Sequence, residues 1–440
     1  MRIHRTASST GGSTGRGGGD GLESARVVTR HERFALAAFA LILAVFGWQG
    51  LTDSDGSLRP EQDHTITLSL SRQLETYHEY HPDFVYPLPA VVMKLALGQL
   101  GSGPSSVLWM ALLIAAGVGC VHALSLLWPP AAGRHRYAAP LLGALAIAYC
   151  LQWDYRAVNA NTLFLALVLF AFVALERGRD GAAGALLAAS VALKLYSAPL
   201  LVLFALRGRG RAVAWTCAWG LVFFGLAPAL WFGPGAAWQL SGLWIDQMLS
   251  TASAEAASRV TAYNVSLGTV MHALFDREGA PSSLAALSSR AIALAFACAV
   301  ALWIGRRRGD FAADPPRAST ALDTLIGVGL GLAAMLLLSP LAQPHHGVVL
   351  WPLAAVTAGL ALDPAATSAR RRAAFAILGA VFLALIAAPS GLGKAIALNA
   401  AIGLLGAGGI LAAASARAPV SPPAPDRCPR SPSPPSTRAR

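Results

Sequence analysis

GVGLGLAAMLLLSP, at residues 327–340, is an unbroken apolar run that decides the fold class of this 440-residue chain. Runs of the same kind recur from Phe34 to Ala414, among them PLLGALAIAYCLQW at 140–153. A helix of about twenty apolar residues crosses a hydrocarbon core, whereas a transmembrane β-barrel shows short segments of alternating polarity. The sequence therefore predicts an all-α polytopic membrane protein and excludes a barrel.

Composition and charge agree with this class. Hydrophobic residues make up 55% of the chain and charged residues only 13%, about half of the roughly 25% that a soluble domain carries. The net charge of +12 comes from short basic clusters between apolar runs, which are typical of topology signals, and we expect no nucleic-acid partner. Four of the five cysteines fall in predicted spans, so we expect no disulfide framework and no metal site; no cofactor is predicted, and dependence on a divalent metal is left open.

The arginine clusters orient the chain. By the positive-inside rule, the clusters at 134–136, 177–179, 207–211, 306–308 and 370–372 face the cytoplasm. We expect a disordered cytoplasmic tail at 1–33, a membrane domain of about ten to twelve transmembrane helices at 34–414, and a second disordered cytoplasmic tail at 415–440. Within the membrane domain, residues 52–104 form a first extracytoplasmic loop with helices lying on the membrane surface. Ten spans are placed near residues 34–51, 105–128, 137–153, 162–176, 212–232, 285–305, 322–342, 346–362, 373–390 and 395–414.

The segment at 182–205 has the length of one span, yet arginine clusters flank both of its ends. We predict a broken hairpin in which Pro199 stops one half-helix, because irregular backbone at membrane depth needs burial in protein or a wet cavity. The alternative is a single span with one loop that violates the charge rule.

Acidic residues gather in the first outward loop. Helical spacing from Ile66 to Tyr77 and strand-like alternation from Thr65 to Ser71 compete there, and we favour a helix. A carboxylate just outside the lipid can accept a proton from a substrate hydroxyl, and Asp63 is our candidate base. The alternative role for Asp63 is the N-cap of that helix.

Lys194 stands in the middle of an apolar stretch and is one of only three lysines. A cation at the centre of a span costs about 2.5–3.5 kcal/mol on insertion scales, so it needs a partner or a water-filled cavity. A phosphate at the membrane surface would satisfy it; the alternative is snorkelling of the side chain to the interface.

Other polar residues lie at outward helix boundaries. SPLAQPHHG places His345 and His346 between two spans, where an imidazole can donate to a phosphate or carry a proton, or can be a solvated loop residue. Further polar residues at these boundaries can hydrogen-bond to sugar hydroxyls, bind phosphate or cap helices, and Asn161 is a candidate N-cap. They are Asp154, Arg156, Asn159, Asn161, Arg259, Tyr263, Asn264 and Ser266.

Taken together, these segments resemble the polyprenyl-phosphate-sugar-dependent bacterial membrane glycosyltransferases of glycosyltransferase family 87, in the GT-C superfamily. The resemblance rests on a loop acid followed by FVYPLP, then VNANTLFLALVLF, GALLAASVALKLYSAPLLVL, YNVSLGTVMHALF and LLLSPLAQPHHGVVLWP. Two motifs depart from the family: its usual Tyr-Pro-Pro reads Tyr86-Pro87-Leu88-Pro89, and its usual Gly-Gln-x-Asn reads Val158-Asn159-Ala160-Asn161.

The resemblance implies inverting transfer of a sugar, mannose or arabinofuranose in relatives, from a polyprenyl phosphate to a glycolipid or cell-envelope glycan on the outer face of a bacterial plasma membrane, with both termini cytoplasmic. Asp63 would be the base and His346 a second catalytic residue. The donor phosphate would be bound by Lys194, Arg156, His345 and Arg259, and the sugar or acceptor by Tyr86, Asn159, Asn161 and Asn264. The main alternative is a transporter or flippase of a lipid-linked substrate, which would also use broken helices and intramembrane charges.

Overall fold

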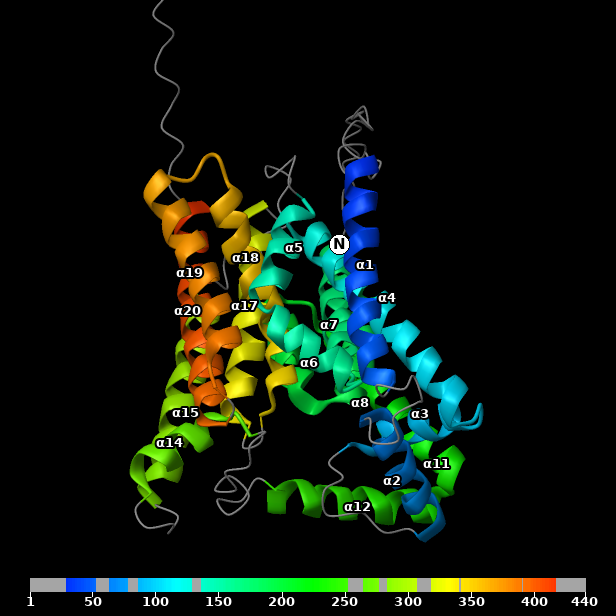
Figure 1. The fold of residues 1–440 in the computed structure, drawn as a ribbon. Helices are drawn as coiled ribbons and strands as arrows, with labels where there is room; N and C mark the ends of the chain where they lie inside the picture. The colour runs from blue at the N-terminus through cyan, green and yellow to red at the C-terminus, as the bar shows by residue number, and fades with distance from the viewer. Residues whose placement is uncertain are drawn as a thin grey trace, which may run out of the picture.

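The computed structural model is a bundle of helices (Figure 1). It describes residues 29–52, 63–77, 86–128, 136–251, 264–276, 283–306, 318–339, 342–389 and 391–416. Every regular element within these ranges is helical, which confirms the all-α prediction.

Seven of the described helical segments are long and apolar enough to cross a membrane. They are α1 (Arg30–Leu51), α4 (Ser102–Leu127), α10 to α11 (Gly210–Phe232), α15 (Ser283–Arg306), the Ala321–Leu338 part of α17 (Ala318–Leu338), η4 to α18 (Pro344–Leu362) and α20 (Leu392–Ala416). The 210–232 span contains a π-helical turn, η3 (Val222–Leu226). The chain is therefore a multi-pass membrane protein.

Several predicted spans do not meet the same criteria of length and composition. Helices α6 (Ala148–Arg156) and α7 (Asn161–Glu176) meet the criteria only when taken together, and they are bent by 117° relative to each other. By this measure the described residues contain at most eight spans, compared with the predicted ten to twelve. The span expected at 137–153 is divided at Ile147 between α5 (Ala138–Ala146) and α6. The span expected at 373–390 belongs to α19 (Ser368–Ala387), whose first turns carry three arginines.

Four shorter helices lie together at one end of the bundle (Figure 1). One of them, α12 (Pro234–Thr251), runs across that end. Beside α12 are α2 (Asp63–Tyr77), α3 (Leu88–Gly98) and α11 (Ala227–Phe232). Their apolar faces share one small core, formed by Leu74, Leu88, Val91, Leu95, Ala237 and Leu240. Residues 63–77 are thus helical, as favoured from the sequence. We call this end of the molecule the α12 end.

The segment at 182–205 turns back on itself. Helix α8 (Asp180–Leu193) is followed by the 3₁₀ helix η2 (Leu195–Leu200) and by α9 (Leu201–Leu206). Arg207, just after α9, pairs with Glu176, just before α8, so the segment leaves and returns at the same end, as a hairpin does. The break is at Lys194, which is extended (φ −151°, ψ 129°), and not at Pro199. Pro199 lies inside η2, five residues after the break.

The first and last described helices extend slightly beyond the expected bounds of the membrane domain. Helix α1 begins at Arg30, inside the expected tail at 1–33, because Thr29 and Glu32 form a capping box that starts the helix before the apolar run. At the other end, α20 continues to Ala416, beyond the expected boundary at 414.

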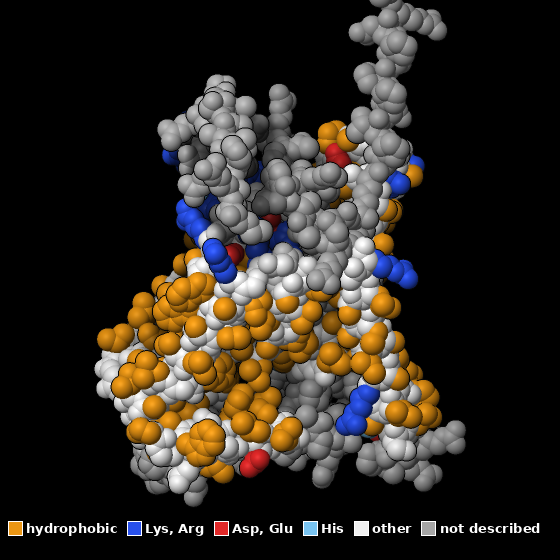
Figure 2. All heavy atoms as spheres, turned by 180° about the vertical axis from the view of Figure 1, so that it is seen from behind, with side chains coloured by type: hydrophobic (Ala, Val, Ile, Leu, Met, Phe, Trp, Pro, Cys, Tyr) orange, Lys and Arg blue, Asp and Glu red, His pale blue; other side chains and the backbone are white. Residues whose placement is uncertain are grey.

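The surface has the distribution expected of a membrane protein. Figure 2 shows a broad belt of hydrophobic side chains, with most of the visible Lys and Arg above it. Inside, glycines let backbones approach: a Cβ at Gly50 would lie 2.5 Å from the Arg156 carbonyl oxygen, and one at Gly143 would lie 2.6 Å from the Ala355 nitrogen. Such small residues allow close helix packing where no hydrophobic effect drives association.

Candidate donor-binding site

Lys194, at the break of the hairpin, lies at the centre of a polar cluster. Its Nζ donates hydrogen bonds to Asn159 Oδ1 (2.8 Å) and to Asn161 Oδ1 (2.7 Å). The same Nζ is 5.8 Å from the ring centroid of Tyr86, the residue that precedes α3 by two positions. The extended backbone at Lys194 therefore brings a cation, two amides and an aromatic ring together.

Asp154 supports this cluster from the last turn of α6 and is fully buried. Its Oδ1 accepts from Asn161 Nδ2 (2.9 Å), and its Oδ2 accepts from the Thr162 backbone N–H (3.0 Å) and hydroxyl (2.5 Å). The carboxylate thus satisfies a free N–H in the first turn of α7, the usual task of an N-cap side chain. It also fixes the Asn161 amide so that its oxygen, and not its nitrogen, faces Lys194.

Asn161 is consequently not the N-cap suggested by the sequence. It is the first residue of α7, and Ala160 occupies the cap position without a side-chain hydrogen bond. The Asn161 side chain is already engaged by Lys194, Asp154 and the His345 carbonyl oxygen (3.3 Å), so it cannot bend back to cap its own helix.

His345 joins the cluster, and His346 lies beside it, with its ring centroid 4.6 Å from that of His345. His345 is buried, and its Nε2 lies 3.2 Å from Asn159 Nδ2. The His346 ring is 5.6 Å from the Tyr196 ring, and the Tyr196 hydroxyl is 3.2 Å from Ser339 Oγ. Because His346 Nδ1 accepts from the Gln343 backbone N–H (3.1 Å), the neutral imidazole carries its proton on Nε2. His346 can therefore act as a hydrogen-bond donor through Nε2.

Of the other predicted residues, Arg156 and Asn264 have side chains that the structure describes, and both lie apart from the hydrogen bonds of this cluster. Arg156 is exposed at the end of α6, and within the described residues no hydrogen bond of its side chain ties it to the cluster. Asn264 is buried, but its Oδ1 accepts from the backbone N–H groups of Ser266 (3.1 Å) and Ala342 (3.3 Å), so it fastens two loops together. Arg259 lies outside the described residues. Asp63 is the first residue of α2, and its side chain lies outside the described part of the chain.

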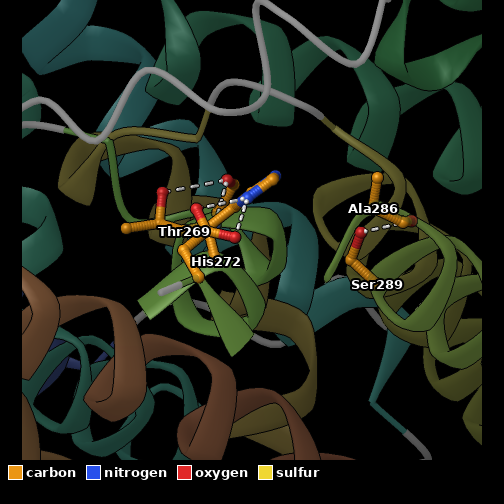
Figure 3. A network of polar contacts seen from close by, with 6 residues as sticks. Thr269, His272, Ala286 and Ser289 are labelled. Atoms are coloured by element: carbon orange, nitrogen blue, oxygen red, sulfur yellow. Dashed lines mark hydrogen bonds and ion pairs between the residues drawn. The ribbon is translucent and has the colours of Figure 1, made fainter. Parts of the chain in front are cut away.

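A second polar network lies on α14 (Leu267–Phe275), near α15 (Figure 3). Ser266 caps α14 by accepting from the Thr269 N–H (3.3 Å). One turn later, His272 Nδ1 pairs with the Asp276 carboxylate (3.0 Å), while its buried Nε2 has no hydrogen-bond partner among the residues that the structure describes. This network is local to α14 and shares no hydrogen bond with Lys194 among the described residues.

Three residues here were not assigned a place in the site from the sequence. Thr162 and Tyr196 were not singled out, and Asp154 was named only among the polar residues that could read a sugar, bind phosphate or cap a helix. Asp154 and Thr162 flank the Asn159 motif, and a carboxylate within an otherwise apolar run was the available signal. Tyr196 carries no signal of its own, because only the turn of the backbone at Lys194 directs it toward Ser339. No three metal-ligating side chains converge anywhere in the described ranges.

The family model described as glycosyltransferase family 87 matches residues 84–340, more than half of the chain. The match includes Tyr86, Asp154, Asn159, Asn161 and Lys194, and it ends just before the His345-His346 pair. No curated protein matches the chain, and no solved structure does so either.

Proposed function

The chain belongs to glycosyltransferase family 87 and is thus a membrane glycosyltransferase, and from this premise we propose that it moves a sugar from a polyprenyl-phosphate donor to a glycolipid or cell-envelope glycan. Mannose is the first candidate sugar and arabinofuranose the second. We place the reaction at the α12 end, on the outer face of a bacterial plasma membrane, since the opposite helix ends carry the arginine clusters that the positive-inside rule assigns to the cytoplasm.

The observation that carries the proposal is Lys194, held by two amide oxygens inside an apolar bundle. A lysine at such a site is costly unless a group of opposite charge or a wet cavity meets it. The leaving group in this reaction is a phosphate that gains negative charge as the bond to the sugar breaks. A preorganised ammonium in a site of low dielectric would stabilise that charge more in the transition state than in the ground state.

The histidines fit a supporting role at the same phosphate. With Nδ1 accepting from the Gln343 N–H, His346 can donate Nε2–H to a phosphate oxygen. His345 would hold the Asn159 amide from the side opposite Lys194. Tyr86, whose ring lies near Lys194, is our candidate for contact with the sugar.

We propose Asp63 as the base. The acceptor hydroxyl oxygen attacks the anomeric carbon, the bond from that carbon to the phosphate oxygen breaks, and polyprenyl phosphate leaves with the electron pair. The hydroxyl proton passes to the Asp63 carboxylate late in an oxocarbenium-like transition state, so an ordinary ionised aspartate suffices. One direct displacement inverts the anomeric configuration.

The test is sugar transfer in membranes from radiolabelled polyprenyl-phosphate mannose, repeated with the arabinofuranose donor. Lys194→Met is compared with Lys394→Met, because Lys394 Nζ donates to backbone carbonyls of α19, at Leu385 and Ile386. Among the described residues it makes no hydrogen bond with the cluster. We expect product with the wild type and with Lys394→Met. The rate with Lys194→Met should fall at least about a hundredfold, equivalent to the roughly 2.7 kcal/mol or more that one electrostatic group supplies. Asp63→Asn should give no product.

Two results would contradict the proposal. Equal activity of Lys194→Met and Lys394→Met would remove Lys194 from the donor site. Movement of intact labelled donor across vesicles, without product under any acceptor, would favour the flippase alternative.

A further inference from the structure

Val158 holds a backbone conformation that valine rarely adopts. Its φ is +54°, and it is the single non-glycine residue with a positive φ among those that the structure describes. In this left-handed region the side chain crowds the following carbonyl oxygen, and β-branching makes the crowding worse. Strain of this kind persists only where neighbouring contacts impose it.

The strain belongs to the end of α6, which closes as a Schellman motif. The Val158 N–H donates to the Tyr155 carbonyl (3.1 Å), and the Asn159 N–H donates to the Asp154 carbonyl (3.0 Å). The left-handed residue of this motif is usually glycine. This turn sets the direction of the backbone at Asn159, so that the Asn159 side chain lies between Lys194 and His345.

Trp109, on α4, holds the strained residue from outside the motif. Its side chain is fully buried, and its Nε1–H donates to the Val158 carbonyl oxygen (3.1 Å). The buried Lys94 of α3 places its Nζ 4.1 Å from the centroid of the Trp109 ring, a distance at which a cation–π contact orients the indole. One chain of contacts therefore joins Lys94, Trp109, Val158, Asn159 and Lys194.

We propose that Trp109 is a positioning residue for the donor site: its indole N–H holds the Val158 peptide in the left-handed conformation and thereby keeps the Asn159 amide on Lys194. The role in donor binding rests on the proposed function, whereas the effect on the turn does not.

The chain offers a matched control for Trp109→Phe. Trp351 is also fully buried, and its Nε1–H donates to a backbone carbonyl oxygen, that of Pro140 (2.8 Å). Each Phe variant loses one buried indole hydrogen bond, so a general loss of stability affects both. We expect Trp109→Phe to raise the KM for the polyprenyl-phosphate donor about three- to tenfold with a smaller change in kcat, and Trp351→Phe to change neither by more than about twofold.

The double variant separates positioning from packing. Glycine occupies the left-handed region without strain, so in the Val158→Gly background the turn no longer depends on Trp109. We expect Trp109→Phe to change the donor KM less than about twofold in that background. Equal effects of Trp109→Phe with valine and with glycine at 158 would overturn the proposal.

Hydrogen–deuterium exchange of the 157–160 backbone supplies a readout that needs no donor. The Asn159 N–H should exchange about tenfold faster in Trp109→Phe and at the wild-type rate in Trp351→Phe. Faster exchange without an effect on the donor KM would leave the turn assigned and would contradict only the role in donor binding. Unchanged exchange would refute the control of Val158 by Trp109.

Discussion

The strain at Val158 predicts that glycine at this position is less destabilising, relative to alanine, than it is in a helix. A second buried valine serves for comparison. Val158 and Val168 are both 0% exposed, but Val168 lies inside α7 with ordinary helical geometry. Truncation of either to alanine removes the same two methyl groups and leaves a cavity whose lining loses packing contacts.

The step from alanine to glycine separates the sites. In a helix interior, as at 168, it costs about 0.8–1.0 kcal/mol. At 158, glycine also loses more backbone entropy on folding than alanine does, which costs about 0.5–1 kcal/mol. This cost is offset because glycine avoids the strain of about 1–2 kcal/mol that alanine has in a left-handed conformation. The Ala-to-Gly step is therefore expected to be about 1–2 kcal/mol more favourable at 158 than at 168.

The assay is reversible unfolding in mixed micelles by titration with SDS, followed by tryptophan fluorescence. Five proteins are compared: the wild type, Val158→Ala, Val158→Gly, Val168→Ala and Val168→Gly. An Ala-to-Gly step of the same size at both positions would refute the reasoning, because the strained turn would then contribute nothing.

Three further predictions use the same unfolding assay. Glu176→Gln should cost about 2–4 kcal/mol, because it removes the acidic member of a largely buried pair with Arg207. Thr324→Val, which removes the 3.0 Å hydroxyl bond to Glu176 and keeps that pair, should cost about 1 kcal/mol, and equal losses would contradict the pair. Asp154→Asn should cost about 2–3 kcal/mol, because an amide cannot accept all three hydrogen bonds that the carboxylate accepts; unchanged stability would mean that Asp154 does not cap α7. Trp231→Phe should cost about 1 kcal/mol through loss of its 2.8 Å hydrogen bond to Glu75. Trp238→Phe, at a side chain 82% exposed, should leave the stability unchanged. Unchanged stability of Trp231→Phe would show that this bond does not fasten α2 to α11.

The sequence predicted the fold class because hydropathy at the scale of a span is strong and local. The apolar runs and the arginine clusters mark spans and ends directly, and the hairpin at 182–205 follows from the two clusters that flank it. The break at Lys194 was misplaced at Pro199, since proline is the visible helix breaker, whereas the hydrogen bonds from Lys194 to Asn159 and Asn161 form only in the folded state.

Within the site, the residues with unusual chemistry in an apolar setting were found: Lys194, the two asparagines and the histidines. Roles that depend on which way a helix faces were not found. Asp154 caps α7 by accepting from the Thr162 N–H, eight residues along the chain, beyond the reach of local capping rules. Asn264 binds two loop backbones.

The site lies where three helical paths are interrupted. The end of α6 at Val158, the break at Lys194 and the gap between Ser339 and η4 (Pro344–Leu350) meet there. Inside a membrane, irregular backbone is tolerated only where side chains or neighbouring helices satisfy the freed polar groups. Here Asn161 accepts from Lys194 and donates to the His345 carbonyl, while Trp109 donates to the Val158 carbonyl. Asn161 thus both satisfies the broken backbone and holds the ammonium, and Trp109 bonds the peptide beside Asn159, which also holds it. A change at any one interruption is therefore expected to disturb the other two.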